Sequence, residues 1–474
     1  MTTIADQFLS LSLLLSLLLV PNPTHGSQPE TNIGLTMSFI HRDSPGSPLY
    51  RRDNLTFPER IRKLVRRTKT RNRHPSDAIE PELIRAKTDI QRISAFLVEV
   101  GIGTFPNATV PPLYIPYFLL FDTGSDIIWT QCEDCRKPGN QCFNQTEPIF
   151  PNSRSASFRA VKCSDRLRLC SPTSSQCRGG TCTFRNDYHD SSSASGIFGM
   201  ETFTFGSTTA GQQESVRLVF GCGNDQRGFQ FGRSSSSSST NWIAGMMGSS
   251  WGQLSLMGQL RLQTNGRFSY CIPKRGNDGR VPSSFLRFGF DIPQRRGLRA
   301  TALLRYGDLS HYYLNLQDMS LGGRRLMIPR NYFVRNGTVR GSAIDSGSEL
   351  SMIIGPAFAI LKSSILNYFR GRPGFGPAPS MHGLEVCLTR PASVGFGQLP
   401  RIGFLFGEGA VLEVMPENSY VLGEFSGVKY FCLGMLRSRD ITILGALQQI
   451  NQRIVYDTRA MRLYFGAEIC QLNA

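Results

Sequence analysis

The sequence predicts a mainly β protein built from two related β lobes. From about residue 92 onward, short apolar alternations are punctuated by Gly, Pro, Ser and Asn, as at 216–220 and 411–415, which is typical of strands and turns. A chain of 474 residues also exceeds what one hydrophobic core usually serves. The stretch Phe-Asp-Thr-Gly-Ser-Asp at 121–126 recurs as Ile-Asp-Ser-Gly-Ser-Glu at 344–349, which indicates that the second lobe repeats the first.

The N-terminal residues predict the compartment. Residues 9–20 form a leucine-rich apolar run, followed by Pro21 and by small residues near position 26. This is the pattern of a signal peptide over residues 1–26, and the run is too short to span a bilayer. We therefore expect a secreted protein, extracellular (apoplastic) or vacuolar, without a membrane anchor.

A basic region follows the signal peptide. Residues 27–90 carry a dense Lys and Arg run at 60–73 and predict a removable prosegment. Within it, residues 57–67 combine a Pro near a helix start with spaced apolar residues, which predicts a short amphipathic helix, although a charged linker would give the same pattern. The N-terminal lobe is then expected at 91–285 and the C-terminal lobe at 286–474.

The cysteines and sequons fit secretion. All twelve Cys lie after residue 130, and an even number suits a disulfide framework in an oxidising compartment. The pair Cys132-x-x-Cys135 could suggest zinc, but no His or second close Cys pair follows at ligand spacing, so no metal is expected. The Asn-x-Ser/Thr sequons stand at Asn54, Asn107, Asn144 and Asn336.

The net charge of +17 raises the question of an anionic partner. Residues 91–474 contain 39 Lys and Arg against 26 Asp and Glu, so +13 remains without the prosegment. No basic stripe interleaved with aromatic residues accompanies this excess, which argues against a nucleic-acid partner. A solvated surface or attraction to acidic wall polymers accounts for the charge.

The repeated Asp motif carries the chemistry. Peptide hydrolysis without a metal or covalent nucleophile needs a base to activate water and an acid to protonate the substrate. Asp122 and Asp345 supply both if they share one proton, because two adjacent carboxylates do not both ionise easily. The residues that allow a tight loop and orient the carboxylates are Gly124, Ser125, Gly347 and Ser348. Each motif is followed by two apolar residues and a Gly, at 246–248 and 443–445.

At these motifs the sequence resembles the pepsin-like aspartic peptidases, most closely the plant group that includes the nepenthesins. The resemblance runs from about residue 35 to the C-terminus and rests on segments starting at Phe39, Asp122, Tyr312, Ile443, Val455 and Leu463. It implies a bilobal pepsin-like acid protease fold with the active-site cleft between the lobes. It also implies an aspartic endopeptidase that acts at acid pH through a water activated by Asp122 and Asp345, without a cofactor.

The resemblance extends to residues around the cleft. It makes Tyr188 the flap tyrosine that covers substrate and Trp129 its partner, with plain aromatic packing of both rings as the less favoured alternative. The family usually has Tyr-Gly-Asp-Gly-Ser here, whereas His189 and Ser191 replace both glycines. We expect the replacements to affect flap mobility and substrate preference.

The same resemblance implies covalent links and partners. Cys387 is expected to pair with Cys432, and Cys271 with Cys470. The expected partners are a polypeptide substrate, the chain's own prosegment and pepstatin-like inhibitors, and the protein is expected to be a monomer. The short distance from Asp345 to Gly445 leaves no room for the saposin-like insert of other plant aspartic peptidases.

Two other functions are compatible with parts of the sequence. Gly248-Ser-Ser-Trp-Gly252 fits the elbow of serine hydrolases, with a helical pattern at 253–260 and His311 and His382 downstream. No alternating strand and helix series surrounds it. The second alternative is a catalytically weak pepsin-like binding protein that inhibits a cell-wall-degrading glycosidase, and only the altered flap supports it.

Overall fold

The structure is a computed structural model. It describes residues 33–50, 57–71, 96–106, 113–165, 167, 169–170, 176–188, 192–206, 213–229, 241–276, 280–307, 311–337 and 340–473. Outside these ranges lie the predicted signal peptide, the sequons at Asn54 and Asn107, and His189 and Ser191 of the flap.

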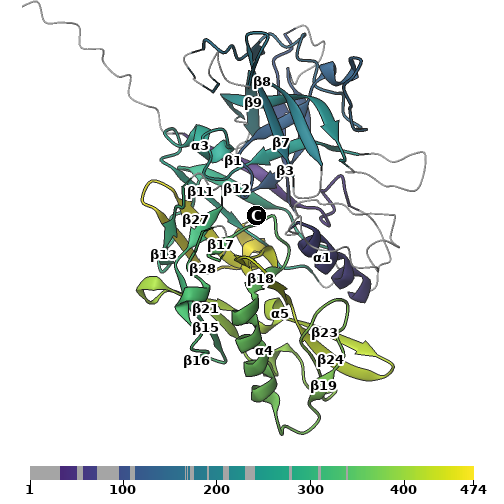
Figure 1. The fold of residues 1–474 in the computed structure, drawn as a ribbon, viewed down its shortest axis with the longest axis vertical. Helices are drawn as coiled ribbons and strands as arrows, with labels where there is room; N and C mark the ends of the chain where they lie inside the picture. The colour runs from purple at the N-terminus through teal and green to yellow at the C-terminus, as the bar shows by residue number, and fades with distance from the viewer. Residues whose placement is uncertain are drawn as a thin grey trace, which may run out of the picture.

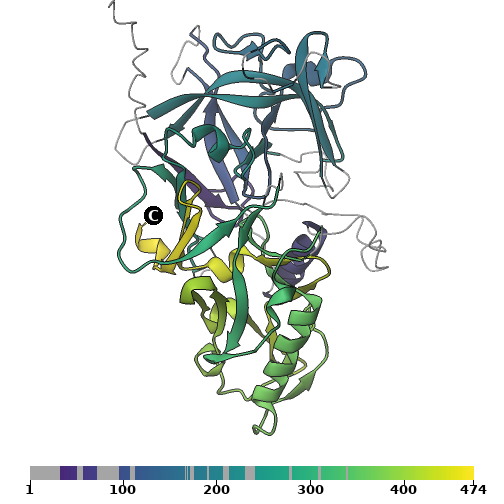
Figure 2. The same cartoon turned by 60° about the vertical axis from the view of Figure 1, so that its left-hand side comes forward.

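Two β lobes follow each other along the long axis of the molecule, the N-terminal lobe above the C-terminal lobe in Figure 1. The last residues of the chain return to the junction between the lobes (Figures 1 and 2). The predicted mainly β, two-lobed architecture is confirmed.

Strands are the main regular structure of both lobes. The first half of the chain contains β1 (Gly34–His41), β2 (Phe96–Ile102), β3 (Ile115–Asp122), β4 (Ile128–Gln131), β5 (Arg159–Ala160), β6 (Cys177–Arg178), β7 (Thr181–Asp187), β8 (Ser193–Gly206), β9 (Gln213–Arg227), β10 (Ile243–Gly248), β11 (Arg267–Cys271) and β12 (Ser284–Gly289). The second half contains β13 (Arg299–Leu304), β14 (Tyr312–Leu314), β15 (Leu316–Leu321), β16 (Arg324–Arg325), β17 (Ser342–Ile344), β18 (Ser351–Ile354), β19 (Gly376–Ala378), β20 (Cys387–Thr389), β21 (Ile402–Phe406), β22 (Val411–Val414), β23 (Tyr420–Phe425), β24 (Val428–Leu433), β25 (Met435–Ser438), β26 (Thr442–Leu444), β27 (Gln452–Asp457) and β28 (Arg462–Ala467).

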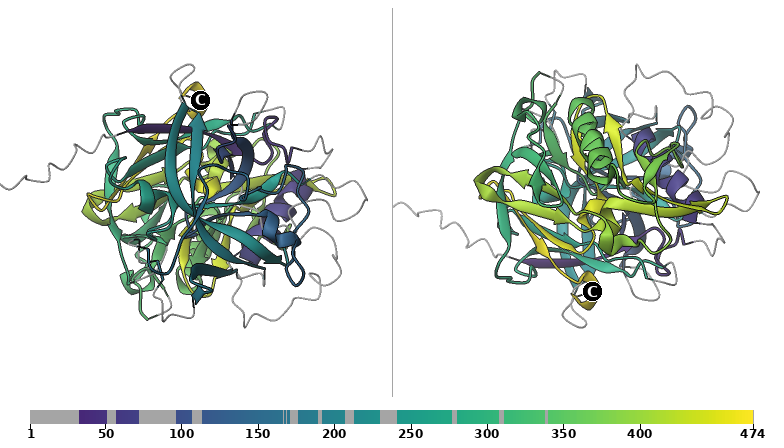
Figure 3. Two further views of the ribbon diagram at one scale, coloured as in Figure 1. Left: turned by 90° about the horizontal axis from the view of Figure 1, so that it is seen from above. Right: turned by 90° about the horizontal axis from the view of Figure 1, so that it is seen from below.

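Helices are few and short. In the described ranges they are α1 (Phe57–Arg71), α3 (Leu256–Leu260), α4 (Gly355–Phe369) and α5 (Pro416–Ser419), with short 3-10 turns between strands. α1 lies where the sequence predicts a helix, and α3 is the C-terminal part of the pattern at 253–260. α4 lies on the outer face of the C-terminal lobe (Figure 3). Within the described residues, no helix has the length and apolar character needed to cross a membrane.

The lobe repeat predicted from the Asp motifs appears in the strand pairing. β10 runs parallel to β3, so that Gly248 faces Asp122. β26 runs parallel to β17, so that Leu444 faces Ile344, the residue before Asp345. β10 also pairs antiparallel with β4, and β26 with β18. Each lobe therefore places its Asp at the end of a strand that is paired with the apolar-apolar-Gly strand.

A sheet shared by both lobes joins them. β11 of the N-terminal lobe pairs antiparallel with β27 of the C-terminal lobe, and β12 pairs with β11. Phe268 stacks on Tyr456 across this junction, with ring centroids 4.3 Å apart. This continuous sheet fixes the two Asp-bearing loops relative to each other.

Part of the basic region at 27–90 belongs to the same sheet. β1 pairs with β12 on one side and β2 on the other, and Leu35, Met37 and Phe39 are buried in the core. α1 packs on the C-terminal lobe near the lobe junction (Figures 1 and 2). There its Ile61 and Val65 belong to a buried apolar cluster with residues of the C-terminal lobe that include Leu350 and Met352. The amphipathic pattern therefore forms a helix, and β1 and α1 of the basic region are docked on the lobes.

All twelve Cys form disulfides. The pairs are Cys132–Cys222, Cys135–Cys142, Cys163–Cys177, Cys170–Cys182, Cys271–Cys470 and Cys387–Cys432. The last two are the pairings that the resemblance implies. The two sequons within the described residues, Asn144 and Asn336, have exposed side chains.

Candidate active site

The first Asp loop follows β3. Asp122 is almost fully buried, and its Oδ1 accepts a hydrogen bond of 2.9 Å from the Gly124 backbone N–H. The Ser125 hydroxyl donates to Asp122 Oδ2 over 2.5 Å. Both carboxylate oxygens of Asp122 are therefore oriented by Gly124 and Ser125, as the motif predicts.

The second Asp loop repeats this arrangement after β17. Asp345 Oδ1 accepts from the Gly347 N–H at 2.8 Å, and Asp345 Oδ2 accepts from the Ser348 hydroxyl at 2.9 Å. Asp345 and Ser348 are buried. Donors at the second and third residues after the Asp thus bind the same two oxygens in both lobes, which gives the pair a common geometry with approximate twofold symmetry.

Thr123 connects the two loops directly. Its hydroxyl donates to Asp345 Oδ1 over 3.3 Å and accepts from the Ser346 N–H over 3.2 Å. Since Thr123 and Ser346 each directly follow an Asp, these bonds bring the two carboxylates together at the lobe junction. Neither residue was assigned a role from the sequence, although the hydroxyl residue after each Asp was the available signal.

Two glycines permit the close approach of the strands behind the loops. A Cβ on Gly248 would lie 2.5 Å from the Ser125 carbonyl oxygen, and a Cβ on Gly445 would lie 2.4 Å from the Leu350 carbonyl carbon. Real Cβ atoms do not approach backbone atoms this closely. The Gly in each apolar-apolar-Gly segment is therefore required for packing against the Asp loop of its own lobe.

Buried tyrosines lie behind the carboxylates. Tyr312 donates to the Ser249 carbonyl over 2.8 Å and so links the C-terminal lobe to the strand end behind Asp122. Tyr270 and Tyr456 share a hydrogen bond of 3.0 Å. Burial raises the pKa of all three phenols, with Asp345 contributing at Tyr270 and Tyr456. These tyrosines stay neutral at acid pH and rigidify the base of the site.

The predicted flap residues are joined by a hydrogen bond. Trp129 is fully buried, and its Nε1–H donates to Tyr188 Oη over 2.6 Å. Tyr188 is the residue after β7, and its N–H donates to the Ser192 carbonyl, next to the last β7–β8 pair, Asp187 with Ser193. Phe229 packs against both rings. The structure thus brings the predicted pair together as a polar contact within an aromatic cluster.

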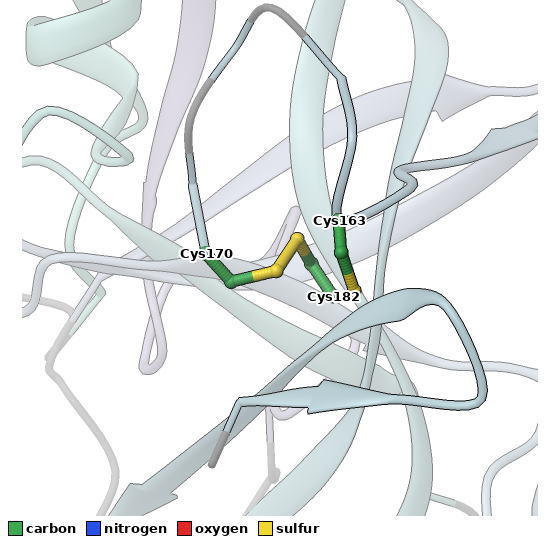
Figure 4. Close-up of side chains that lie close together, drawn as sticks. All are labelled: Cys163, Cys170 and Cys182. Atoms are coloured by element: carbon green, nitrogen blue, oxygen red, sulfur yellow. A yellow bond between two sulfur atoms is a disulfide. The ribbon is translucent and has the colours of Figure 1, made fainter. Parts of the chain in front are cut away.

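Three neighbouring sulfur atoms resemble a metal site but are engaged in disulfides. The Sγ atoms of Cys163, Cys170 and Cys182 lie within 4.8 Å of one another (Figure 4). Cys163 is bonded to Cys177, and Cys170 to Cys182. Because metals bind the thiolate form of Cys, this cluster cannot act as a zinc site while the disulfides are intact. Cys132 and Cys135 are likewise disulfide-bonded.

The serine hydrolase elbow does not form a nucleophile. Ser250 is fully buried, and its hydroxyl donates to Asp126. His382, one of the two downstream histidines, bonds to the Tyr430 hydroxyl at 2.6 Å. In this structure Ser250 orients the segment that follows the first Asp motif.

Comparisons with known proteins agree with this fold. Two family models match, one described as "Xylanase inhibitor N-terminal" over residues 96–289 and one as "Xylanase inhibitor C-terminal" over residues 311–467. Aspartic proteinase nepenthesin-1 of Nepenthes gracilis is 31% identical over 409 residues, which cover 83% of this chain and 86% of the relative. Aspartic proteinase nepenthesin-2 of the same plant is 29% identical over 454 residues, 94% of this chain and 92% of the relative.

Solved structures share the fold at low identity. The crystal structure of edgp matches with a TM-score of 0.60 and 14% identity, and covers 82% of this chain and 95% of its own. Basic 7S globulin from soybean matches with a TM-score of 0.56 and 16% identity, over 79% of this chain and 97% of its own. Taken with the matched models and the nepenthesins, the chain belongs to the pepsin-like aspartic peptidase family, in its plant nepenthesin-like group.

Proposed function

We propose that the protein is an aspartic endopeptidase that hydrolyses polypeptides at acid pH. Asp122 and Asp345 are the proposed catalytic pair, and together they carry one proton. The ionised member takes a proton from water as the water attacks the peptide carbonyl, and the protonated member donates to the carbonyl oxygen. The pair titrates as a unit, so neither role is assigned to one residue.

The observation that carries the proposal is the matched hydrogen bonding of the two carboxylates. In each lobe a Gly N–H and a Ser hydroxyl bind the Asp oxygens, and Thr123 links one loop to the other carboxylate. A protein that only binds a partner needs no such convergence of two buried carboxylates. Tyr188 and Trp129 are proposed to form the flap side of the substrate cleft.

We further propose secretion as a zymogen. Six disulfides fit an oxidising compartment. The docking of β1 and α1 on the lobes supports residues 27–90 as a prosegment that is removed later. The exposed Asn144 and Asn336 are proposed glycosylation sites.

The decisive experiment is digestion of denatured globin between pH 2 and 6 by the processed protein, with and without pepstatin. Asp122→Ala and Asp345→Ala serve as inactive controls. We expect cleavage that pepstatin blocks and that both substitutions abolish. Absence of pepstatin-sensitive cleavage across this range would reject the peptidase proposal.

The family models' description favours one further candidate function. Because both models carry the words "Xylanase inhibitor", the same preparations should be assayed for inhibition of a xylanase. Inhibition by the Asp345→Ala protein, together with inactivity of the wild type on globin, would support the glycosidase-binding alternative instead.

A further inference from the structure

Glu349 is a buried carboxylate beside the second Asp loop. It directly follows Ser348, whose hydroxyl orients Asp345, and only 4% of Glu349 is exposed. The backbone around it is fixed, since its carbonyl accepts from the Leu447 N–H over 2.9 Å. Whatever reaches the Glu349 side chain is therefore close to the proposed catalytic pair.

The partner of this carboxylate belongs to α1. The Arg67 guanidinium donates to Glu349 Oε1 over 2.6 Å. One residue further along each segment, the Leu350 N–H donates to Thr68 Oγ1 over 3.1 Å. Glu349 Oε2 has no hydrogen-bond partner in the part of the chain that the structure describes. α1 thus presents a cation to the side chain and an acceptor to the backbone at this edge of the Asp loop.

The two Asp loops differ in how far they are covered. Gly124 and Ser125 in the first loop are half-buried, whereas Gly347 and Ser348 in the second are buried. α1 contacts the segment immediately after the second loop. Removal of α1 would therefore uncover the Glu349 side of the site.

The charges around Glu349 come from the same removable region. Burial raises the pKa of the Glu349 carboxyl, while the nearby Arg67 and Arg42 guanidinium groups act in the opposite direction. Arg42, Arg67 and the neighbouring anion Asp43 all lie within 27–90. Loss of this region takes both cations away, so the ionised form of the buried Glu349 becomes costly unless another cation binds beside it.

We propose that Glu349 is a specificity-determining residue that receives a lysine or arginine side chain of the polypeptide substrate, at the place that Arg67 occupies here. The inference rests on the proposed peptidase function and adds a substrate class to it. In the full-length chain Arg67 occupies the position proposed for the substrate's cationic side chain. Its ion pair with Glu349 blocks this position until α1 leaves.

The first test measures cleavage preference. The full-length chain is cut at two inserted protease sites, one in residues 51–56 and one in residues 72–95, so that the fragment carrying α1 dissociates while β1 stays in the sheet. Peptides with Arg, norleucine or Glu scanned through each position are then digested. We expect one position at which Arg is favoured over norleucine in kcat/KM by at least about tenfold. Glu349→Gln should abolish this ratio and Glu349→Arg should shift it toward Glu. Glu385→Gln, an exposed acidic side chain of the same lobe, should keep it.

The second test measures the binding of an α1 peptide to the protein and does not depend on catalysis. A labelled peptide of residues 57–71 is titrated into the α1-depleted protein, and its Arg67→Gln version is the control. We expect about tenfold weaker binding of the Arg67→Gln peptide to the wild type and no difference between the peptides with Glu349→Gln. If globin is never cleaved but this difference is present, the peptidase function fails and the cation site stands. Cleavage without an Arg preference at any position overturns the specificity proposal, whatever the peptide does.

Discussion

Single side chains connect the lobes at the candidate site, and Thr123 is the clearest case. It follows Asp122 in sequence but donates to Asp345 of the other lobe, at 3.3 Å. The position of the Thr123 hydroxyl therefore depends on both lobes, and a local sequence pattern cannot predict such a contact between lobes. A hydrogen bond to a charged group contributes about 1.5–3 kcal/mol.

We predict that Thr123→Ala lowers kcat on a fluorogenic peptide by roughly 10- to 100-fold, the rate equivalent of such a bond. Thr123→Ser keeps a hydroxyl and should retain most of the activity. Equal losses in the two variants would show that the methyl group, rather than the hydrogen bond, is what matters at this position.

Gly445 gives a second prediction for one residue. A Cβ there would lie 2.4 Å from the Leu350 backbone, so Gly445→Ala should lower the free energy of unfolding by about 1–3 kcal/mol through overpacking. Gly397, whose added Cβ would contact nothing within 4 Å, is the matched control. Thermal unfolding followed by circular dichroism should show a lower Tm for Gly445→Ala only.

At the scale of strands and hairpins, the β7–β8 hairpin is attached to strand β4 through Tyr188 and Trp129. Tyr188 directly follows β7, and its hydroxyl accepts a hydrogen bond from the Trp129 indole N–H over 2.6 Å. Tyr188→Phe would leave this fully buried donor without its acceptor, at a cost of about 1–3 kcal/mol.

We therefore expect Tyr188→Phe to reduce kcat/KM for peptides, to weaken pepstatin binding and to lower Tm through the unsatisfied indole N–H. Phe229→Leu is a useful comparison, since it changes the packing of the same aromatic cluster without removing the hydrogen bond. A Tyr188→Phe protein with wild-type kcat/KM would argue that the pair is only packing.

The docking of β1 should weaken in acid. His41 ends β1, its Nδ1 accepts from the Asp43 N–H over 3.1 Å, and burial lowers its pKa to about 3, aided by Arg275, Arg42 and Arg67 and opposed by Asp43. Because the folded pKa lies below the ordinary value of 6.5, the unfolded segment binds the proton more readily. The stability from neutral His41 is present above pH 6.5 and is lost as the pH falls toward 3.

Hydrogen exchange of residues 34–41 in the full-length chain measures this effect. We expect protection to fall between pH 6.5 and 4 in the wild type and to change less in His41→Phe, which has no titratable ring. If both proteins lose protection equally as the pH falls, the loosening of β1 from the sheet is controlled by carboxylates rather than by His41.

Across the whole chain, the sequence predicted what is periodic or repeated. The two Asp motifs, their apolar-apolar-Gly partners and the short strands are local patterns that predict two related β lobes. The parallel pairing of β10 with β3 and of β26 with β17 is how the structure realises that repeat. The contacts between distant segments could not be predicted in this way. The insertion of β1 between β2 and β12, and the ion pair of Arg67 with Glu349, depend on how three separate parts of the chain meet.

The disulfide between Cys271 and Cys470 has a consequence for how the molecule survives damage. It links the end of β11 to the C-terminal turn over 199 residues of sequence, and the exposed stretch 293–297 lies inside that loop. A protease that cuts this stretch would produce a two-chain molecule whose halves stay covalently attached. Such a nicked protein should migrate as one species on a non-reducing gel and as two fragments after reduction, and it should remain active until its cystines are reduced.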